Sequence, residues 1–533
     1  MISNNKEKNF IKGAMILAVA GVIVKGLGAA FRIPITNKIG SGMAYYNVAY
    51  TIYSVFLVLA TAGIPVAVSR LVAEKKATGH HKAAHKVFTV SLVLLGSIGL
   101  CTSLICFFGA DKFSTLIKIP EAKMSLKAIS PAICIVPVMS AFRGYFQGMQ
   151  NMKPTAVSEL VEQLFRVIIG LVLTFSLFSY GLQASAAGAT FGASAGSIMG
   201  LVIILLIYKC NKKKIIRDIE SGKMECENTR LILKKIACIS IPIICGAEIM
   251  PLMSMIDTSI IVARLEATGW THQAATDMYS QYGAYCSTLI GLPQIFTQAV
   301  SVSLVPALAT AFQRNRTKDV EEKICSGMRL SMIMSFPCAV GMFSLAKPIL
   351  LTLYPYQEED ALSAVPLLMI MTVGIVLLSA VQTLTGALQA IDKQIVPVKN
   401  LAIGAVAKGI VTYILVSIPF ISIKGAAIGT ICAYLIAFVL NLKAIRKYTN
   451  VQFHIIKIYV KPFIASAIMG ISTFIVQYAL SISLSNSFST IIAIAFGIII
   501  YFFIIIRNEI LPKEDVELIP GGKFLLKINK IKS

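Results

Sequence analysis

Residues 487–506, SFSTIIAIAFGIIIYFFIII, form an apolar run of 20 residues without a charged side chain. A helix of about 20 residues spans the hydrocarbon core of a bilayer. The whole chain agrees with this stretch, because 56% of its 533 residues are apolar, 14% are charged and the mean hydropathy is +0.78. A soluble domain carries about 25% charged residues. The chain is therefore predicted to be an all-α integral membrane protein.

Similar apolar windows recur along the chain and predict about 14 transmembrane helices. They lie at residues 11–33, 44–68, 86–109, 125–146, 154–178, 184–208, 236–262, 280–311, 328–346, 363–388, 398–420, 425–442, 460–480 and 487–506. Strands of a membrane barrel are about 10 residues long and alternate in polarity, so these long and uniformly apolar runs exclude a barrel.

The basic residues are distributed unevenly between the two sides of this arrangement. The chain has 49 Lys and Arg against 25 Asp and Glu. With the N-terminus inside, 37 of these cations, Arg143 among them, fall on the cytoplasmic side and eight on the opposite side. This is the positive-inside pattern, which predicts a multi-pass protein of the cell membrane with both termini in the cytoplasm. The net charge of +24 is thereby explained without a nucleic-acid partner.

Several features recur in order at nearly one spacing and predict a parallel repeat of six helices. They are the pairs Tyr50 and Tyr285, Pro65 and Pro306, Pro154 and Pro397, and the small-residue stretches 186–190 and 425–430. Two such lobes would be related by an axis along the membrane normal, with a substrate path between them. The predicted parts are an N-lobe (1–208), a basic cytoplasmic loop (209–235), a C-lobe (236–442), an extra helix pair (443–506) and a cytoplasmic tail (507–533).

The first predicted span carries two cations on one helical face. Gly21, Lys25, Gly28 and Arg32 are spaced i, i+4, i+7 and i+11, so they share a face. Charges inside a membrane usually face the bundle interior or a wet cavity, which favours a cavity-lining role for Lys25 and Arg32. The alternative is that both side chains snorkel toward the outer surface.

Acidic residues fall within two other spans. Glu162 and Arg166 have the spacing of a helical ion pair, and structural pairing and substrate contact remain equal alternatives for them. Glu248 and Asp257 lie in a span that two prolines are expected to interrupt, an arrangement that suits a coupling cation (Na⁺ or H⁺) or a gate. Glu162 is a further candidate for this coupling or gating role. The alternative for Glu248 is an ion pair with Lys408 in the eleventh span.

Uncharged polar residues complete the predicted cavity. Gln294 and Gln298 share one face of the eighth span, where they either bind substrate in the cavity or join helices by hydrogen bonds. Asn47, near the start of the second span, is predicted to line the cavity. The chain has no C-x-x-C pair, and His80, His81 and His85, whose spacing could hold a metal weakly, lie in a Lys-rich segment predicted to be a solvated loop. No metal, catalytic residue or organic cofactor is therefore expected.

A stripe of Tyr46, Tyr50 and Tyr53 near the outer end of the second span has the composition of an interfacial aromatic belt. These three residues are therefore predicted to lie at the level of the lipid headgroups.

Three motifs in the first half of the chain resemble a known family. They are GLGAAFRIP at 26–34, AGIPVAVS at 62–69, and FRGYFQGMQ at 142–150 followed by KPT at 153–155. They resemble the stage V sporulation protein B family, in the polysaccharide-exporter branch of the MOP superfamily, beside the MurJ-type lipid II flippases.

The resemblance implies a fourteen-helix, two-lobe protein that moves an undecaprenyl-pyrophosphate-linked sugar precursor of peptidoglycan or spore cortex outward by alternating access. Lys25 and Arg32 match the place of two arginines in helix one of the MurJ-type proteins. With Arg166 and Lys408 they are the expected pyrophosphate ligands, and the last two spans would hold the polyprenyl tail. The expected partners are this lipid-linked precursor and membrane lipid, with the protein acting as a monomer that associates with cell-wall synthesis enzymes.

Two other functions are compatible with the residues. A MATE-type exporter of organic cations needs an uncompensated carboxylate, for which Glu248 and Asp257 are candidates. A membrane enzyme acting on lipid-linked sugars needs an acid, a base or a metal at the outer face. The short outer loops show no such motif, so the chain is not expected to be an enzyme.

Overall fold

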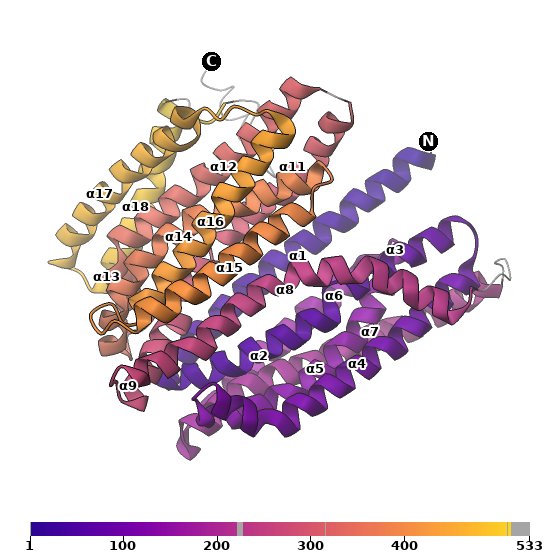
Figure 1. The fold of residues 1–533 in the computed structure, drawn as a ribbon, viewed down its shortest axis with the longest axis horizontal. Helices are drawn as coiled ribbons and strands as arrows, with labels where there is room; N and C mark the ends of the chain where they lie inside the picture. Colours follow the sequence, from indigo (N-terminus) through magenta and orange to yellow (C-terminus); the bar gives the residue numbers. More distant parts are fainter. Residues whose placement is uncertain (1, 221–226, 315, 509, 513–533) are drawn as a thin grey trace. The chain divides into compact units, whose positions relative to one another are not determined.

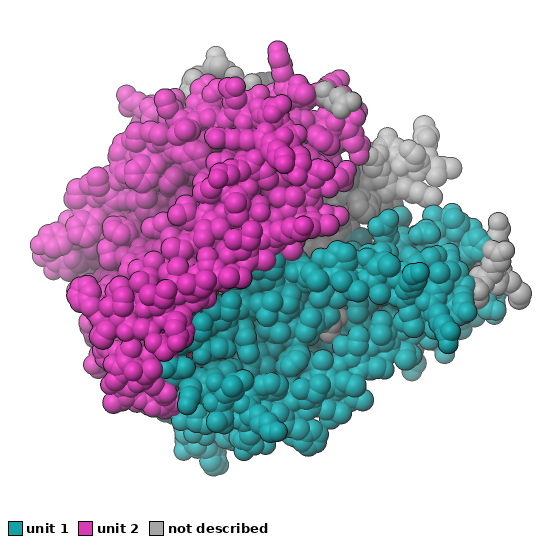
Figure 2. Space-filling view, viewed as in Figure 1, with its two compact units in different colours: residues 1–263 teal, residues 264–533 magenta. Residues whose placement is uncertain are grey.

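The computed structural model describes residues 2–220, 227–314, 316–508 and 510–512, and within these ranges its regular elements are helical (Figure 1). The chain forms two compact units, residues 1–263 (unit 1) and 264–533 (unit 2), which Figure 2 colours separately. The all-α prediction is confirmed.

Unit 1 consists of long helices joined by short turns. These are α1 (Ile2–Ile39), α2 (Met43–Thr61), α3 (Ile64–Ala77), α4 (His81–Leu116), α5 (Lys123–Gly148), α6 (Lys153–Ser176), α7 (Leu182–Glu220) and most of α8 (Thr229–Ala267), with the 3-10 turns η1 (Gly40–Gly42), η2 (Pro120–Ala122) and η3 (Phe178–Tyr180).

Unit 2 has a similar series of helices followed by an additional pair. These are α9 (His272–Ser280), the π-helix η4 (Gln281–Cys286), α10 (Ser287–Gly291), α11 (Gln294–Gln313), α12 (Thr317–Ser344), α13 (Ala346–Leu353), α14 (Glu358–Ala390), α15 (Ile395–Val416), α16 (Lys424–Thr449), the π-helix η5 (Ile456–Val460), α17 (Lys461–Ser481) and α18 (Asn486–Arg507). The pair α17–α18 packs against α12 and α13 at one edge of unit 2 (Figure 1).

Twelve segments of the described residues are long and apolar enough to cross a membrane. One of them, residues 23–77, contains the second half of α1 together with the α2–α3 pair. The chain reverses direction between these two parts at the turn η1 (Figure 1). The charged helix α6 is outside the twelve, although its 24 residues would extend about 36 Å. Separating α1 from α2–α3 and adding α6 accounts for the fourteen predicted spans.

Two spans predicted as single helices are broken, and those two predictions were wrong. The second span is divided between α2 and α3 at Ala62–Gly63, and the eighth is divided into η4, α10 and α11 with an interruption before Gln294. Proline lacks the N–H that continues a helix, and Pro65 and Pro293 lie at these interruptions. At Gly63 the chain also approaches α8 so closely that a Cβ would lie 2.9 Å from the Cα of Ser240.

Several helices extend beyond the apolar windows. α7 continues to Glu220, so the first part of the predicted loop 209–235 is helical, and α1 extends through Pro34 to Ile39. Apolar windows detect only the part of a helix that lies in lipid, and backbone hydrogen bonding continues into water. The boundary between the two units follows Ala263 and leaves most of α8 in unit 1. The sequence repeat instead predicts a C-lobe that begins at residue 236 and includes most of this helix. The lobe boundaries stay a prediction.

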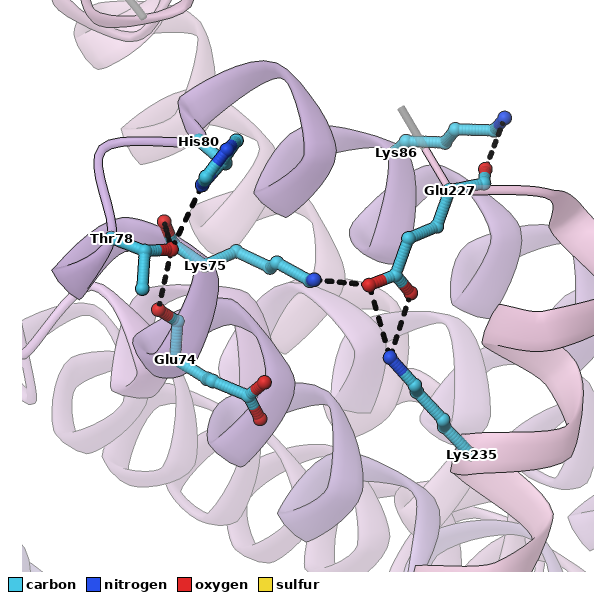
Figure 3. A network of polar contacts seen from close by, with 7 residues as sticks. All are labelled: Glu74, Lys75, Thr78, His80, Lys86, Glu227 and Lys235. Carbon is cyan, nitrogen blue, oxygen red and sulfur yellow. Dashed lines mark hydrogen bonds and ion pairs between the residues drawn. The ribbon is translucent and has the colours of Figure 1, made fainter. Parts of the chain in front are cut away.

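A polar network joins three helices of unit 1 at the end where α3 finishes and α4 and α8 begin (Figure 3). The Glu227 carboxylate accepts a hydrogen bond from Lys75 and bonds of 3.0 Å from Lys235 to each of its oxygens. Its backbone carbonyl accepts a bond of 2.7 Å from Lys86. The ammonium groups of Lys75 and Lys235 lower the pKa of Glu227 below its ordinary value.

The packing of α7 on α6 positions the charges of α6. Gly192, Gly196 and Gly200 form a stripe along α7, and a Cβ at the first two would lie 2.7 Å from the Arg166 carbonyl oxygen and 3.0 Å from the Arg166 nitrogen. A Cβ on Gly200 would lie 3.1 Å from the Cβ of Glu162. Small residues allow two membrane helices to approach closely. The α6 segment with the charged side chains is therefore held tightly by the backbone of α7.

Candidate substrate-binding site

Arg32 on α1 is joined to α2 through a hydrogen bond and an aromatic contact. Its Nη2 donates to Oδ1 of Asn47 over 2.8 Å, and its guanidinium carbon lies 5.7 Å from the centroid of the Tyr46 ring. Arg32 is half-buried and Asn47 is 6% exposed. The arginine is thus held inside unit 1 against the first turns of α2.

Glu162 on α6 binds two arginines. Its Oε1 lies 3.1 Å from Nη2 of Arg166, and its Oε2 lies 2.9 Å from Nη2 of Arg143 on α5. Arg143 also donates to Oγ of Ser158 over 2.8 Å. All three charged side chains are largely buried, and half-buried Glu159 acts electrostatically on Arg143 from the preceding turn of α6. Structural pairing, one of the two alternatives for Glu162 and Arg166, is present in the structure.

The tyrosine stripe of α2 lies inside unit 1, so the prediction of an interfacial belt was wrong. Tyr46 is 5% exposed and Tyr53 is 1% exposed. The rings of Tyr46 and Tyr50 stack with centroids 5.8 Å apart, and those of Tyr50 and Tyr53 are 5.6 Å apart. Stacked rings and the neighbouring guanidinium groups stabilise each other within the protein, which explains why the stripe is not placed at the lipid headgroups.

The stacked tyrosines of α2 connect Arg32 on α1 with Arg166 on α6. Tyr46 interacts electrostatically with both Arg32 and Arg166, and Tyr53 interacts with Arg166 and Glu162. We call the resulting set the arginine–tyrosine cluster. Its members are Arg32, Tyr46, Asn47, Tyr50, Tyr53, Arg143, Glu162 and Arg166.

Three buried polar atoms of the cluster have no hydrogen-bond partner among the residues that the structure describes. They are Nδ2 of Asn47, the hydroxyl oxygen of Tyr53 and Nε of Arg166. Buried polar groups in proteins almost always have a partner, which is either protein, ordered water or a ligand. Two of these atoms are N–H donors and the third is a hydroxyl, which suits the oxygen atoms of an anionic or sugar-containing ligand.

Lys25 lies outside this tightly packed region. Its side chain is exposed, and a Cβ on neighbouring Gly21 or Gly26 would have no atom within 4 Å among the described residues. A Cβ on Gly28 would lie 3.6 Å from Nε2 of Gln163, so α1 meets α6 at the next turn. The structure therefore places Arg32 within the arginine–tyrosine cluster and Lys25 outside it, earlier on the same helix.

Glu248 and Asp257 are buried on α8, with 7% and 5% exposure. The helix is continuous through Pro242 and Pro251, so the expected interruption at the prolines is absent. Neither carboxylate oxygen of Glu248 has a hydrogen-bond partner within the described part of the chain. Its predicted pairing with Lys408 stays a prediction, because that lysine belongs to the other unit.

Lys408 is buried on α15 in a position that corresponds to Arg166. A Cβ on Gly192 of α7 would contact the Arg166 carbonyl oxygen, and one on Gly429 of α16 would lie 3.3 Å from the Lys408 carbonyl oxygen. In each of the pairs α6–α7 and α15–α16, the backbone of a residue with a cationic side chain therefore lies against a glycine of the second helix. This local likeness agrees with the repeat read from the sequence.

The two glutamines of α11 differ in their exposure to solvent or lipid. Gln298 is exposed and Gln294 is half-buried. Between them, Thr297 donates from its hydroxyl group to Oε1 of Gln382 on α14 over 2.7 Å. Thr297, which the sequence analysis did not single out, thus helps to join α11 to α14 at this level.

Arg143 was missed by the sequence analysis, which counted it among the cytoplasmic cations. One signal was available. Arg143 and Ser158 are nearly equidistant from the turn that joins α5 to α6, and such residues tend to face each other in an antiparallel helix pair.

Ionisable residues inside a multi-pass helical bundle usually mark a substrate or ion pathway, which is typical of membrane transporters. Residues 10–312, more than half of the chain, match the family described as polysaccharide biosynthesis protein. The chain belongs to the polysaccharide biosynthesis protein family. Residues 242–414 also match the MatE family.

Two curated proteins of Bacillus subtilis (strain 168) are similar over nearly their full lengths. Stage V sporulation protein B is 28% identical over 523 residues, covering 96% of this chain and 98% of that protein. Lipid II flippase MurJ is 26% identical over 541 residues, covering 97% and 98%. The resemblance inferred from the sequence motifs is confirmed.

Solved structures show the same fold. Lipid II flippase MurJ in an inward closed conformation superposes with a TM-score of 0.66 at 18% identity, covering 93% of this chain and 100% of that one. An inward-facing multidrug resistance MATE family transporter of the MOP superfamily gives 0.64 at 14% identity, covering 80% and 96%. The chain therefore shares the fold of these two solved structures.

Proposed function

We propose that this protein moves an undecaprenyl-pyrophosphate-linked precursor of peptidoglycan or spore cortex outward across the cytoplasmic membrane by alternating access. The observation that carries the proposal is the arginine–tyrosine cluster inside a chain related over its full length to a lipid II flippase. Stage V sporulation protein B, the other relative described above, supports a sporulation context.

The cluster has the chemistry that such a headgroup requires. A pyrophosphate diester carries about two negative charges, and moving it into a region of reduced dielectric without counter-charges costs several kcal/mol. Guanidinium groups bind phosphate oxygens with short charge-assisted hydrogen bonds. Arg32 and Arg166 are the proposed primary ligands in unit 1, with Lys25 as an entry residue on the exposed part of α1 and Lys408 as the counterpart in unit 2.

The polyprenyl tail requires only an apolar surface. Large apolar side chains are exposed along α17 and α18, among them Ile471, Ile499 and Phe503. We assign the tail to this helix pair, where it remains in contact with lipid while the headgroup crosses.

The proposal is tested with the purified protein in proteoliposomes that contain a fluorescent lipid-linked precursor. Outward movement exposes the headgroup to a membrane-impermeant reagent, so the accessible fraction should rise with time. Arg166→Ala should abolish this rise, whereas Lys443→Ala, at an exposed position near the end of α16, should not. Equal rates for the protein, Arg166→Ala and empty liposomes would contradict the proposal.

The coupling ion, the orientation of the chain in the membrane and its protein partners are part of the same proposal. Glu248, buried without a hydrogen-bond partner in the described ranges, is the proposed binding group for a coupling Na⁺ or H⁺. Both termini are proposed to lie in the cytoplasm, which the positive-inside pattern supports. The protein is proposed to act as a monomer that associates with cell-wall synthesis enzymes.

The second candidate function is MATE-type export of organic cations. It is favoured by one observation, which is that Glu248 and Asp257 are buried carboxylates within the segment that matches the MatE family. Uptake of a fluorescent organic cation into inverted vesicles, driven by an imposed ion gradient and lost in Glu248→Gln, would favour this function. Precursor movement without cation uptake would exclude it.

A further inference from the structure

Unit 2 contains a cavity of about 580 Å³ at the end where α12 begins and α18 finishes. Its walls come from the first turns of α12, from the segment that leads into α17, and from the residues that follow α18. In Figure 1 these helix ends lie at the same end of unit 2. The predicted topology places this end on the cytoplasmic side.

The cavity has an excess of positive charge. Lys318, Arg329, Lys457 and Lys461 line it, together with the acidic residues Glu321 and Glu322. Four permanent cations against two carboxylates leave a net charge of about +2 before His454, another lining residue, is considered. The N-terminus of the 28-residue helix α12 lies at the same place and adds the positive end of its dipole.

The walls are fixed to each other by hydrogen bonds. Oε1 of Glu321 accepts a bond of 3.0 Å from the backbone nitrogen of Gln452, and Sγ of Cys325 lies 3.7 Å from the carbonyl oxygen of the same residue. Arg329 donates to Oγ of Ser326 over 3.4 Å. One of the two carboxylates is therefore engaged in holding the loop to α12, and the cationic side chains surround the remaining space.

The span pattern predicts that the cavity lies at the boundary between lipid and water. Lys457 and Lys461 fall in the first turns of a membrane span that covers residues 456–481. Exposed apolar side chains flank them, with Ile456 66% and Phe463 50% exposed. A ligand at this depth meets cations on one side and apolar surface on the other, which matches a phospholipid better than a freely dissolved phosphate.

We propose that this cavity binds the phosphate headgroup of an anionic phospholipid of the cytoplasmic leaflet. Basic pockets between membrane helices on the cytoplasmic side are suited to such headgroups. The net charge of about +2 is sufficient for one or two phosphates. The inference depends on the cavity of unit 2 alone and not on the transported substrate.

The test uses the full-length protein purified in a neutral detergent and measured by native mass spectrometry with added phosphatidylglycerol or phosphatidylcholine. A cation near a membrane surface contributes about a fivefold factor in affinity for anionic lipid, so Arg329→Gln with Lys457→Gln should weaken phosphatidylglycerol binding about 30-fold. Phosphatidylcholine binding should be unchanged.

The matched control is Lys443→Gln with Lys447→Gln, which removes two exposed cations near the end of α16 that do not line the cavity. Its affinity should stay close to that of the parent. An equal loss in both double variants would show that only general surface charge is involved and would overturn the proposal.

Two further measurements distinguish a lipid site from a folding defect and from a site for soluble phosphate. Lys457 is exposed, so Lys457→Gln alone should fold and still lose about fivefold in affinity if the double variant is unstable. Inorganic phosphate is tested by thermal unfolding of the same proteins. Saturable stabilisation by phosphate that is lost in the cavity variant, without any selectivity for phosphatidylglycerol, would assign the site to a soluble phosphate and overturn the lipid proposal.

Discussion

Nη2 of Arg166 lies 3.1 Å from Oε1 of Glu162, one turn earlier on α6. The other oxygen of the same carboxylate binds Arg143 on α5, so a single acid holds two buried guanidinium groups in place. The carboxylate therefore has two effects that can be separated by experiment. It offsets the cost of burying the arginines, and it fixes the position of the proposed pyrophosphate ligand Arg166.

Replacement of Glu162 should destabilise the protein. Glu162→Gln removes the only carboxylate that pairs with both arginines in the described ion pairs, and breaking a buried pair from one side costs about 3–5 kcal/mol. Thermal unfolding in detergent should show a lower midpoint. The control is Glu159→Gln on the preceding turn, where a much smaller change is expected. Equal midpoints for parent and Glu162→Gln would contradict the interpretation.

The cations of α1 should be required for transport but not for insertion. Lys25→Ala and Arg32→Ala remove charge from a span, which favours insertion, so both variants should reach the membrane at parental levels. Precursor movement in proteoliposomes should be lost, because the headgroup loses its counter-charges. Lys25→Arg should retain much of the activity, since the charge persists although its geometry differs.

The Arg32 substitution has a structural consequence that serves as a check. Arg32→Ala also leaves Oδ1 of buried Asn47 without its donor, whereas Lys25→Ala removes an exposed side chain. Arg32→Ala should therefore lower the unfolding midpoint slightly and Lys25→Ala should not. If both alanine variants transport precursor at the parental rate, Lys25 and Arg32 are not pyrophosphate ligands and the site must be sought around Arg166 and Lys408.

Topology can be tested with a membrane-impermeant thiol reagent. Cys226 should be reachable only from the cytoplasm, as should Cys210, which is exposed on the extension of α7. Cys325 is also predicted to lie on the cytoplasmic side, but its side chain is buried. Cys226 lies outside the described residues, so the exposed Cys210 is the better target for labelling. A cysteine introduced at Gln357 should react only from outside. Labelling from the opposite sides would contradict the fourteen-span arrangement.

The role of Glu248 can be separated from a simple ion pair. If the residue binds the coupling ion, Glu248→Gln should remove the dependence of transport on an ion gradient while precursor binding persists. If it is instead paired with Lys408, the double variant Glu248→Gln with Lys408→Met should restore both expression and transport. Rescue by the second substitution would exclude the coupling role.

Glu227 predicts a defined pH dependence of stability. Because its pKa is lowered in the folded state, it stabilises the fold above the pKa of an unfolded carboxyl group, about 4.3, and this contribution disappears as the pH falls through the lower folded value. Glu227→Gln should lower the unfolding midpoint at pH 7, and the difference from the parent should vanish at strongly acidic pH. A constant difference across this range would contradict the linkage to Lys75 and Lys235.

The sequence by itself determined the class of the protein, the number of spans and the family. These properties depend on the local density of apolar residues and on motifs such as GLGAAFRIP at 26–34, so they survive without knowledge of any long-range contact. Helix ends were predicted less well, because α7 continues in water beyond its apolar window to Glu220. The interruptions before Ile64 and Gln294 were also missed, because an apolar window does not register where a helix bends.

Only the tertiary structure decided the composition of the candidate site. The spacing of Glu162 and Arg166 allowed an ion pair on one helix, but the second partner, Arg143, comes from α5 and was assigned to the cytoplasmic surface. The sequence around Tyr53 is compatible with a side chain that faces lipid headgroups and equally with one that packs against a neighbouring helix. The choice depends on which helices pack against that face, and this packing brings together segments far apart in the chain.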